Sequence, residues 1–249
     1  MTHLLDQLCV VMIQTSHAGN IGSAARAMKT MGIHDLRLVN PKQADSAEAR
    51  ALASGADQIL DQARFCSSLQ AATADCHYVI GSSARSERSL SWPQMDARRC
   101  GEWVAQHLQQ QKIAIVFGRE RSGLSNEELQ QCQALVHIPM AVTGYSLNIA
   151  AALQIIAYEC FIASQSLAAP EPNHELDEEP ATMEAMEHFF THLETTLIEA
   201  QYLDPNNPRL LMPRLRRLFG RITPTRSEVN ILRGILSAFQ GKKFQRRSS

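Results

Sequence analysis

Short apolar runs alternate with longer amphipathic segments over residues 1–165, and this alternation predicts the secondary structure. The apolar runs predict buried strands at residues 8–13, 35–40, 78–83, 113–118 and 135–139. The longer segments predict helices at residues 22–32, 46–55, 96–110 and 146–167, and a further helix behind a capping box formed by Ser125 and Glu128. Apolar strands that alternate with helices are typical of a parallel sheet covered on both faces. Residues 1–165 are therefore predicted to form one α/β domain.

The rest of the chain has a different pattern. Residues 166–183 contain three prolines and a run of acidic residues, which indicates a linker. Two apolar stripes then predict a small all-helical domain over residues 184–249, with a short arginine-rich helix between them. The first stripe comprises Phe189, Phe190, Leu193, Leu197 and Tyr202. The second follows a capping box of Thr225 and Glu228 and comprises Val229, Leu232, Ile235, Leu236 and Phe239.

The net charge of −1 conceals a strong asymmetry in the second half of the chain. Residues 170–208 carry ten Asp or Glu residues and no Lys or Arg, whereas residues 209–249 carry eleven Lys or Arg residues and one Glu. Such a basic domain, with a basic tail at its end, indicates a polyanionic partner.

Cysteine usage and hydropathy indicate the compartment. The six cysteines lack any metal-ligand spacing, which favours buried thiols in a reducing environment. The N-terminus has no basic region before its apolar residues, and we read no signal peptide or membrane span. We therefore expect a cytoplasmic protein.

Several common site types are not indicated by the sequence. There is no G-x-G-x-x-G after the first strand and no Walker P-loop, so standard dinucleotide or nucleoside triphosphate binding is disfavoured. There is no HExxH and no Cys/His cluster, so we expect no metal site.

Three polar segments follow predicted strands, where an open parallel sheet binds its ligands. The first contains Asn20 and Arg26, which lie six residues apart and can converge only if Asn20 lies in the loop before the helix. A simple helix cap and a surface arginine are the alternative. The second holds Arg119 and Glu120 between two glycines, which also fits an ordinary charged turn.

The third polar segment contains Ser146 and Asn148 at the start of a long apolar helix. The free backbone N–H groups of a helix start favour anionic or acceptor groups. Simple capping of the helix by Ser146 is the alternative interpretation.

Taken together and in this order, the three segments are more specific than any one alone. N-x-G-x-x-x-R, then F-G-x-E-x-x-G-L, then I-P followed by S-L-N resembles the SpoU branch of the SPOUT methyltransferases. The resemblance implies an α/β domain with a C-terminal trefoil knot that binds S-adenosylmethionine. It also implies a homodimer whose active site is completed across the interface.

The resemblance also implies roles for individual residues. Arg26 matches the family's catalytic arginine, and Asn20 and Glu120 match further motif residues. The implied cofactor-binding residues are Ser82, Ser83, Ala84, Gly118, Ile138, Ser146, Leu147 and Asn148. The loop before Ser146 departs from the pattern of this family, because it carries no acidic residue and contains a glycine.

Two further stretches, GSSAR at 81–85 and NILRGIL at 230–236, narrow the resemblance to bacterial members of the family. These members methylate the ribose 2′-hydroxyl of cytidine or uridine 32 in the tRNA anticodon loop. We expect tRNA contacts from Arg85, Arg119, Arg214, Arg216, Arg217, Arg221 and Arg233. The alternatives are a related enzyme for another tRNA or rRNA ribose, a catalytically silent RNA-binding protein, and a generic nucleotide-binding domain.

The family mechanism casts the arginine as general base. Because an arginine side chain has a pKa above about 12, we favour Arg26 as a fixed positive charge that stabilises the developing alkoxide. The sequence leaves open whether a phosphate, water or the cofactor carboxylate accepts the proton.

Overall fold

Seven parallel strands form one sheet in the first part of the chain. In the computed structural model, which describes residues 4–43, 46–84, 92–142, 145–166 and 179–241, the strand order is β3-β2-β1-β6-β4-β7-β5. The strands are β1 (Leu8–Ile13), β2 (Asp35–Val39), β3 (Arg64–Cys66), β4 (Tyr78–Ser82), β5 (Gln94–Asp96), β6 (Ile113–Phe117) and β7 (Ala134–His137). The predicted parallel α/β sheet is confirmed, whereas the trefoil knot stays a prediction.

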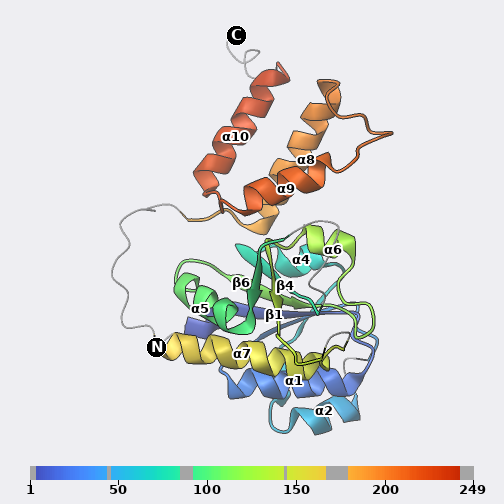
Figure 1. The fold of residues 1–249 in the computed structure, drawn as a ribbon, viewed down its shortest axis with the longest axis vertical. Coiled ribbons are helices and arrows are strands. Elements are labelled where there is room, and N and C mark those ends of the chain that lie inside the picture. The colour runs from blue at the N-terminus through green and yellow to red at the C-terminus, as the bar shows by residue number, and fades with distance from the viewer. Residues whose placement is uncertain (1–3, 44–45, 85–91, 143–144, 167–178, 242–249) are drawn as a thin grey trace. The chain divides into compact units, whose positions relative to one another are not determined.

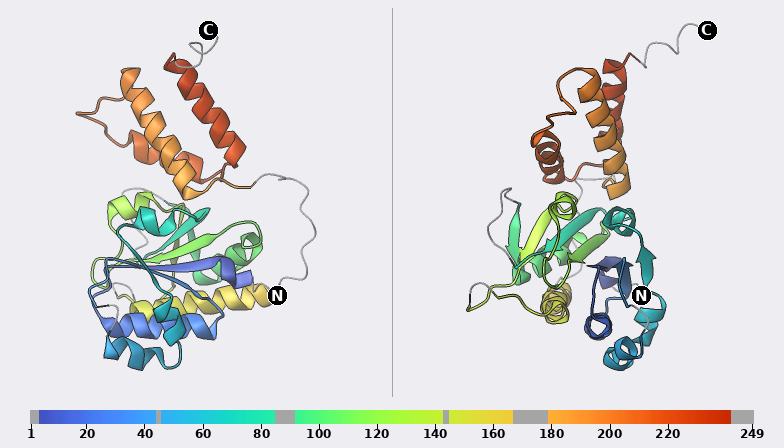
Figure 2. Two further views of the ribbon diagram at one scale, coloured as in Figure 1. Left: turned by 180° about the vertical axis from the view of Figure 1, so that it is seen from behind. Right: turned by 90° about the vertical axis from the view of Figure 1, so that its right-hand side faces the viewer.

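Helices cover both faces of the sheet (Figures 1 and 2). Helix α1 (Ala18–Thr30) and helix α7 (Ile149–Ser166) run side by side along one face, where α5 (Ala97–His107) packs against α7. Helices α4 (Leu69–Thr73) and α6 (Asn126–Gln130) lie on the other face. Helix α2 (Ala47–Ala53) packs outside α1, followed by α3 (Asp57–Asp61), and a 3-10 helix η1 (Leu4–Gln7) precedes β1.

Two glycines permit the close packing of these helices. A Cβ atom at Gly22 of α1 would lie 2.0 Å from the carbonyl oxygen of Ala49 in α2. At Gly101 of α5, a Cβ atom would lie 2.5 Å from the carbonyl oxygen of Glu159 in α7. At both positions the backbones of two helices are in direct contact. A larger residue would fit only if the helices moved apart.

Helix α7 has one buried and one exposed apolar face. Leu153, Ile156 and Cys160 are buried in the core, whereas Tyr158 and Ile162 are 49% and 41% exposed. By length and composition alone this helix could cross a membrane, a test that core helices of soluble proteins also pass. Its packing against α1 and α5 is that of a core helix.

The centre of the sheet forms the core of this unit. Every residue of β1 and β6 is buried, as their apolar sequences predict. All six cysteines are free, and Cys9, Cys76, Cys100, Cys132 and Cys160 are buried, as predicted.

The chain divides into two compact units, Met1–Pro172 and Asn173–Ser249. The second contains helices α8 (Met183–Glu199), α9 (Leu211–Gly220) and α10 (Arg226–Phe239). Phe189, Phe190, Met212, Val229 and Leu236 form its core. Residues 167–178 of the predicted linker lie outside the described residues.

Part of the predicted packing of the helical unit is wrong. Tyr202 lies beyond the end of α8 and is 72% exposed, so it does not continue the first stripe. Ile235 and Phe239 lie on the exposed side of α10, because only Val229, Leu232 and Leu236 face the core. Both predicted capping boxes, Ser125 with Glu128 and Thr225 with Glu228, are confirmed.

Candidate active site

Three loops that are far apart in the sequence enclose a cleft of about 580 Å³ at the carboxyl ends of the strands. Its walls come from residues 82–84 after β4, residues 117–123 after β6, and residues between 138 and 152 that lead into α7. His17 and Asn20, at the start of α1, complete the wall. Open parallel sheets bind their ligands at this edge, so the cleft is the candidate active site.

The carboxylate of Glu120 ties the loop after β6 to the start of α1. Its oxygens accept hydrogen bonds from the backbone N–H of Ser16 (3.0 Å), the hydroxyl of Ser16 (3.0 Å), the backbone N–H of His17 (3.3 Å) and the side-chain amide of Asn20 (3.2 Å). Partial burial raises the pKa of Glu120, but these hydrogen bonds outweigh burial and hold the pKa below its usual value. A charged, hydrogen-bonded carboxylate is suited to positioning its neighbours.

Asn20 extends this connection to the third loop. Its side-chain oxygen accepts a hydrogen bond of 2.8 Å from the side-chain amide of Asn148. The side-chain oxygen of Asn148 in turn accepts a hydrogen bond of 2.8 Å from the backbone N–H of Ala150, in the first turn of α7. Glu120, Asn20 and Asn148 therefore form a continuous hydrogen-bonded chain that links the three predicted segments.

The positions of Asn20 and Asn148 in the structure correct two predictions about where helices α1 and α7 begin. Asn20 lies within the first turn of α1, which begins at Ala18, and not in the loop before the helix. Helix α7 begins at Ile149, so Asn148 and not Ser146 contacts its first turn. Ser146 and Leu147 precede the helix and remain exposed along the cleft.

The structure brings the predicted cofactor-binding residues together. The cleft is lined by all eight, namely Ser82, Ser83, Ala84, Gly118, Ile138, Ser146, Leu147 and Asn148. Their contact with a cofactor stays a prediction.

The motif suggests that position 118 is a glycine so that a ligand can approach the backbone, but the structure gives a different reason. A Cβ atom at this position would lie 2.2 Å from the carbonyl carbon of Gly123 and 2.4 Å from the backbone nitrogen of Leu124. The glycine therefore makes room for the backbone of its own loop, which closes through hydrogen bonds between Arg119 and Gly123.

Arg26 is not brought to the cleft of its own chain. It lies on the exposed face of α1, six residues beyond Asn20, and is absent from the cleft wall among the described residues. The predicted catalytic trio is therefore separated into Asn20 and Glu120 at the cleft and Arg26 outside it.

Arg119 has partners within its own chain. Its guanidinium donates two hydrogen bonds to the carboxylate of Glu128, at 2.9 and 3.0 Å, and a third to the side-chain oxygen of Gln14 at 2.8 Å. This geometry fixes the loop to α6. Arg85 lies outside the described residues.

The arginines of the helical unit differ in their surroundings. Arg216 donates to both carboxylate oxygens of Glu187, at 2.6 and 2.7 Å, and lies over the ring of Phe190, 4.5 Å from its centroid. Among the described residues, no hydrogen bond or ion pair is found for the guanidinium groups of Arg214, Arg217, Arg221 and Arg233, which makes them the better candidates for contact with a polyanion.

Other residues of the cleft wall were not predicted from the sequence. Arg121 is adjacent to Glu120, His17 lies three residues before Asn20, and Met140 and Tyr145 come from the loop before Ser146. Their closeness in sequence to the motifs was the available signal. Which of them faces the cleft depends on the loop conformation, which the motifs do not specify.

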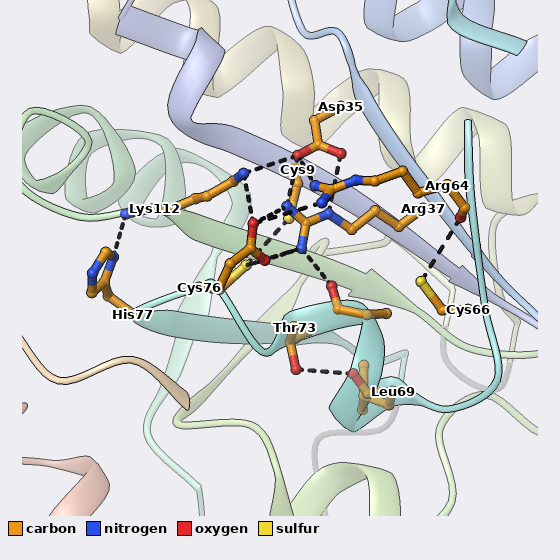
Figure 3. A network of polar contacts seen from close by, with 12 residues as sticks. Cys9, Asp35, Arg37, Arg64, Cys66, Leu69, Thr73, Cys76, His77 and Lys112 are labelled. Carbon is orange, nitrogen blue, oxygen red and sulfur yellow. Dashed lines mark hydrogen bonds and ion pairs between the residues drawn. The ribbon is translucent and has the colours of Figure 1, made fainter. Parts of the chain in front are cut away.

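A second polar cluster lies at the amino ends of the strands, on the opposite edge of the sheet (Figure 3). The fully buried Arg37 contacts the carboxylate of Asp35 at 2.7 Å and that of Asp75. It also donates a hydrogen bond of 2.6 Å to the carbonyl oxygen of Ala72. Lys112 contacts Asp75 at 2.9 Å and Arg64 contacts Asp35 at 2.5 Å, so the cluster contains three cations and two carboxylates.

Two cysteines, Cys9 and Cys76, lie among the side chains of this cluster (Figure 3). The sulfur atoms of Cys9 and Cys76 are 3.5 Å apart, and both residues are buried. Burial raises the pKa of the Cys9 thiol, which keeps it protonated and unreactive. We interpret this cluster as structural.

The two parts of the chain match two known sequence families. Residues 7–158 match the SpoU rRNA Methylase family. Residues 184–249 match the C-terminal domain of the tRNA methyltransferase TrmJ.

Similar proteins span nearly the whole chain. The chain is 46% identical over 245 residues to the tRNA (cytidine/uridine/adenosine-2′-O-)-methyltransferase TrmJ of Pseudomonas aeruginosa, with 95% of both chains covered. It is 47% identical over 238 residues to the tRNA (cytidine/uridine-2′-O-)-methyltransferase TrmJ of Pectobacterium atrosepticum, covering 95% of this chain and 98% of that one. The crystal structure of TrmJ from Z. mobilis superposes with a TM-score of 0.80 at 30% identity, covering 93% of this chain and 98% of that one.

Proposed function

Because this chain belongs to the SpoU methylase family, and to the TrmJ group within it, we propose that it methylates a ribose 2′-hydroxyl of tRNA with S-adenosylmethionine as the methyl donor. The observation that carries the proposal is the hydrogen-bonded chain from Glu120 through Asn20 to Asn148. It joins one residue from each of the three motifs beside a single cleft.

The cleft fits such a methyl donor in size and in chemistry. Its volume of about 580 Å³ falls within the roughly 300–1,000 Å³ usual for small-molecule sites. Phe117, Ile138 and Leu147 offer apolar surface for a base, and Ser82, Ser83 and Ser146 offer hydroxyl and backbone groups for polar atoms. When bound, S-adenosylmethionine supplies an electrophilic methyl group on a sulfonium.

We propose distinct roles for the motif residues. Glu120, Asn20 and Asn148 are positioning residues, because their side chains hydrogen-bond to one another and hold together the loop after β6, the start of α1 and the segment before α7. Alignment of reacting groups contributes as much as about 7–11 kcal/mol to catalysis in the best intramolecular cases. Arg26 supplies a fixed positive charge for the alkoxide that develops on the ribose.

The position of Arg26 supports a homodimeric site. Since Arg26 is exposed and lies outside the cleft of its own chain, we propose that it acts at the cleft of a second copy. The exposed apolar face of α7, with Tyr158 and Ile162, is the proposed dimer surface, because α7 packs beside α1, which carries Arg26.

Subunit mixing tests this arrangement. Arg26→Ala and Asn148→Ala homodimers should both be inactive, and Arg26→Ala should still bind the cofactor in calorimetry. A heterodimer of the two variants should regain activity, because one of its clefts has an intact Asn148 and receives Arg26 from the other chain. Inactive heterodimers would show that Arg26 acts within its own chain or does not act.

We propose cytidine or uridine 32 of the anticodon loop as the target, which places the protein in the cytoplasm with its substrate. The names of both curated relatives support cytidine and uridine, and one adds adenosine. A tRNA carrying 2′-deoxycytidine only at position 32 should accept no methyl group, whereas 2′-deoxyuridine only at position 33 should leave methyl transfer intact. Methyl transfer to the 32-deoxy tRNA would refute this position.

A further inference from the structure

The loop after β6 places three consecutive charged side chains, Arg119, Glu120 and Arg121, at the wall of the cleft. Two of them are committed to their own chain. Arg119 pairs with Glu128 through two hydrogen bonds, and Glu120 accepts hydrogen bonds from the start of α1. The charges of these two side chains are therefore used to hold the loop in place.

Arg121 differs from both neighbours. It is exposed, it lines the cleft, and no hydrogen bond or ion pair of its guanidinium is found among the described residues. Of the Lys and Arg residues that line the cleft in the described part of the chain, it is the one without a carboxylate partner. A guanidinium in this position is available to a ligand.

The loop that carries Arg121 is held on both sides. The backbone N–H of Arg119 donates to the carbonyl oxygen of Gly123 at 3.1 Å, and the backbone N–H of Gly123 donates back at 2.9 Å. Arg121 lies at the tip of this closed loop, and Gly123 supplies the positive φ of 67° that the closure requires. These two hydrogen bonds restrain the backbone at Arg121, and a restrained loop lowers the entropic cost of binding a ligand.

We propose that Arg121 is a positioning residue that binds a backbone phosphate of the RNA beside the target nucleotide. The inference rests on the proposed function, since a ribose that reaches this cleft brings its flanking phosphates with it. A guanidinium matches a phosphate with two parallel hydrogen bonds. The sequence predicted that Arg119 is the residue of this loop that contacts RNA, and we assign that contact to Arg121 instead.

The test compares Arg121→Ala and Arg121→Lys with the matched control Arg98→Ala. Arg98 is also a highly exposed arginine of the first unit, but it lies on α5, where its guanidinium is 3.8 Å from the carboxylate of Glu159, and it is not part of the described cleft wall. Equilibrium binding of unmodified tRNA to the full-length protein is measured between 50 and 300 mM salt, cofactor binding by calorimetry without RNA, and kcat/KM for tRNA.

We expect Arg121→Ala to reduce the salt slope of tRNA binding by about 0.7, the value for one contact to single-stranded RNA. At 0.15 M salt this slope corresponds to roughly fourfold weaker binding. The kcat/KM for tRNA should fall at least as much, Arg121→Lys should restore most of the slope, and the cofactor dissociation constant should not change.

A salt slope equal to that of Arg98→Ala would overturn the proposal. Weaker cofactor binding by Arg121→Ala in the absence of RNA would also overturn it, and would assign the guanidinium to the cofactor carboxylate. Because binding is measured without methyl transfer, a wild-type protein that binds tRNA but does not methylate it would refute the proposed function while the comparison of slopes still decides the role of Arg121.

Discussion

At Gly118, the space of a side chain is taken by the backbone of Gly123 and Leu124. The motif F-G-x-E-x-x-G-L correctly indicates a cleft residue, but the sequence does not say which atoms approach the glycine. The distances of 2.2 and 2.4 Å to backbone atoms assign the constraint to loop closure. A substitution at Gly118 should therefore affect stability as well as binding.

We predict that Gly118→Ala lowers the melting temperature and weakens cofactor binding together. A loss of 1 kcal/mol corresponds to about 2–4 °C for a domain of this size. Differential scanning calorimetry and titration calorimetry measure the two effects, with Ser122→Ala in the same loop as the control for stability. Weaker cofactor binding at an unchanged melting temperature would show that Gly118 makes room for the ligand instead.

The ion pairs of individual arginines could not be predicted from the sequence. Arg119 is nine residues from Glu128, and Arg216 is 29 residues from Glu187, so each pair depends on how helices and loops meet. Both arginines were predicted to contact RNA because the local charge pattern does not distinguish a paired from an unpaired guanidinium.

The buried cluster around Arg37 predicts how stability depends on pH. Partial burial raises the pKa of Asp75, but hydrogen bonds and charge from Arg37 and Lys112 outweigh it and hold the pKa well below its usual value. A carboxylate with a lowered folded-state pKa stabilises the protein above its unfolded pKa of about 3.9, and this stabilisation is lost as the pH falls below that value.

We therefore predict that Asp75→Asn reduces the free energy of unfolding at pH 7, and that its difference from wild type shrinks below about pH 4. Because Asp75 is nearly half exposed, solvent screens the pair, and we expect an effect on the order of 1 kcal/mol. Urea unfolding followed by circular dichroism measures it, with Asp61→Asn, in an exposed pair with Arg50, as the control. A difference that stays constant down to pH 3 would contradict this role.

Strands and helices with an apolar pattern or a capping box were predicted, including the short β7 and α6, whereas β3, β5, α3 and α4 were not. Strands β3 and β5 lie at the sheet edges and have three residues each, none of them fully buried, so they lack the apolar run that signals a strand. On α10, the apolar residues cover more of the helix surface than two neighbouring helices can bury, and the sequence alone does not identify the buried side.

Helix α7 is apolar on a face that its own chain leaves exposed. We predict that Tyr158→Glu combined with Ile162→Glu gives a monomer in light scattering at micromolar concentration and abolishes methylation, because the site then lacks Arg26 of a second copy. Leu52→Glu, at another exposed apolar position, should leave the dimer intact. A wild-type protein that is itself monomeric would refute the shared site.

At the scale of the whole molecule, each unit has its own core. The composition change near residue 166 predicts a division of the chain, and the boundary of the two compact units falls between residues 172 and 173. Binding of a polyanion by the basic residues of the second unit stays a prediction. The spacing of six residues between Asn20 and Arg26 places them on different faces of a regular helix, so their separation depended on where α1 begins. The sequence did not identify Ala18 as that start.

We predict that truncation after residue 165 leaves a folded domain that binds the cofactor but methylates tRNA poorly, since the basic helical unit is lost. If about four phosphates are neutralised, the full-length protein should show a salt slope of about −3 to −4, and the truncated protein should lose a large part of it. Filter binding over a range of salt measures both slopes. Equal slopes would show that the helical unit does not bind the RNA.

Mass spectrometry of nucleosides shows whether this protein methylates a ribose of tRNA. Unmodified tRNA is incubated with the purified protein and S-adenosylmethionine, with the Asn148→Ala variant as the control, and then digested to nucleosides. We predict 2′-O-methylcytidine or 2′-O-methyluridine with the wild-type protein and neither with the variant. Products methylated only on the base, or no methylated nucleoside at all, would refute ribose methylation by this protein.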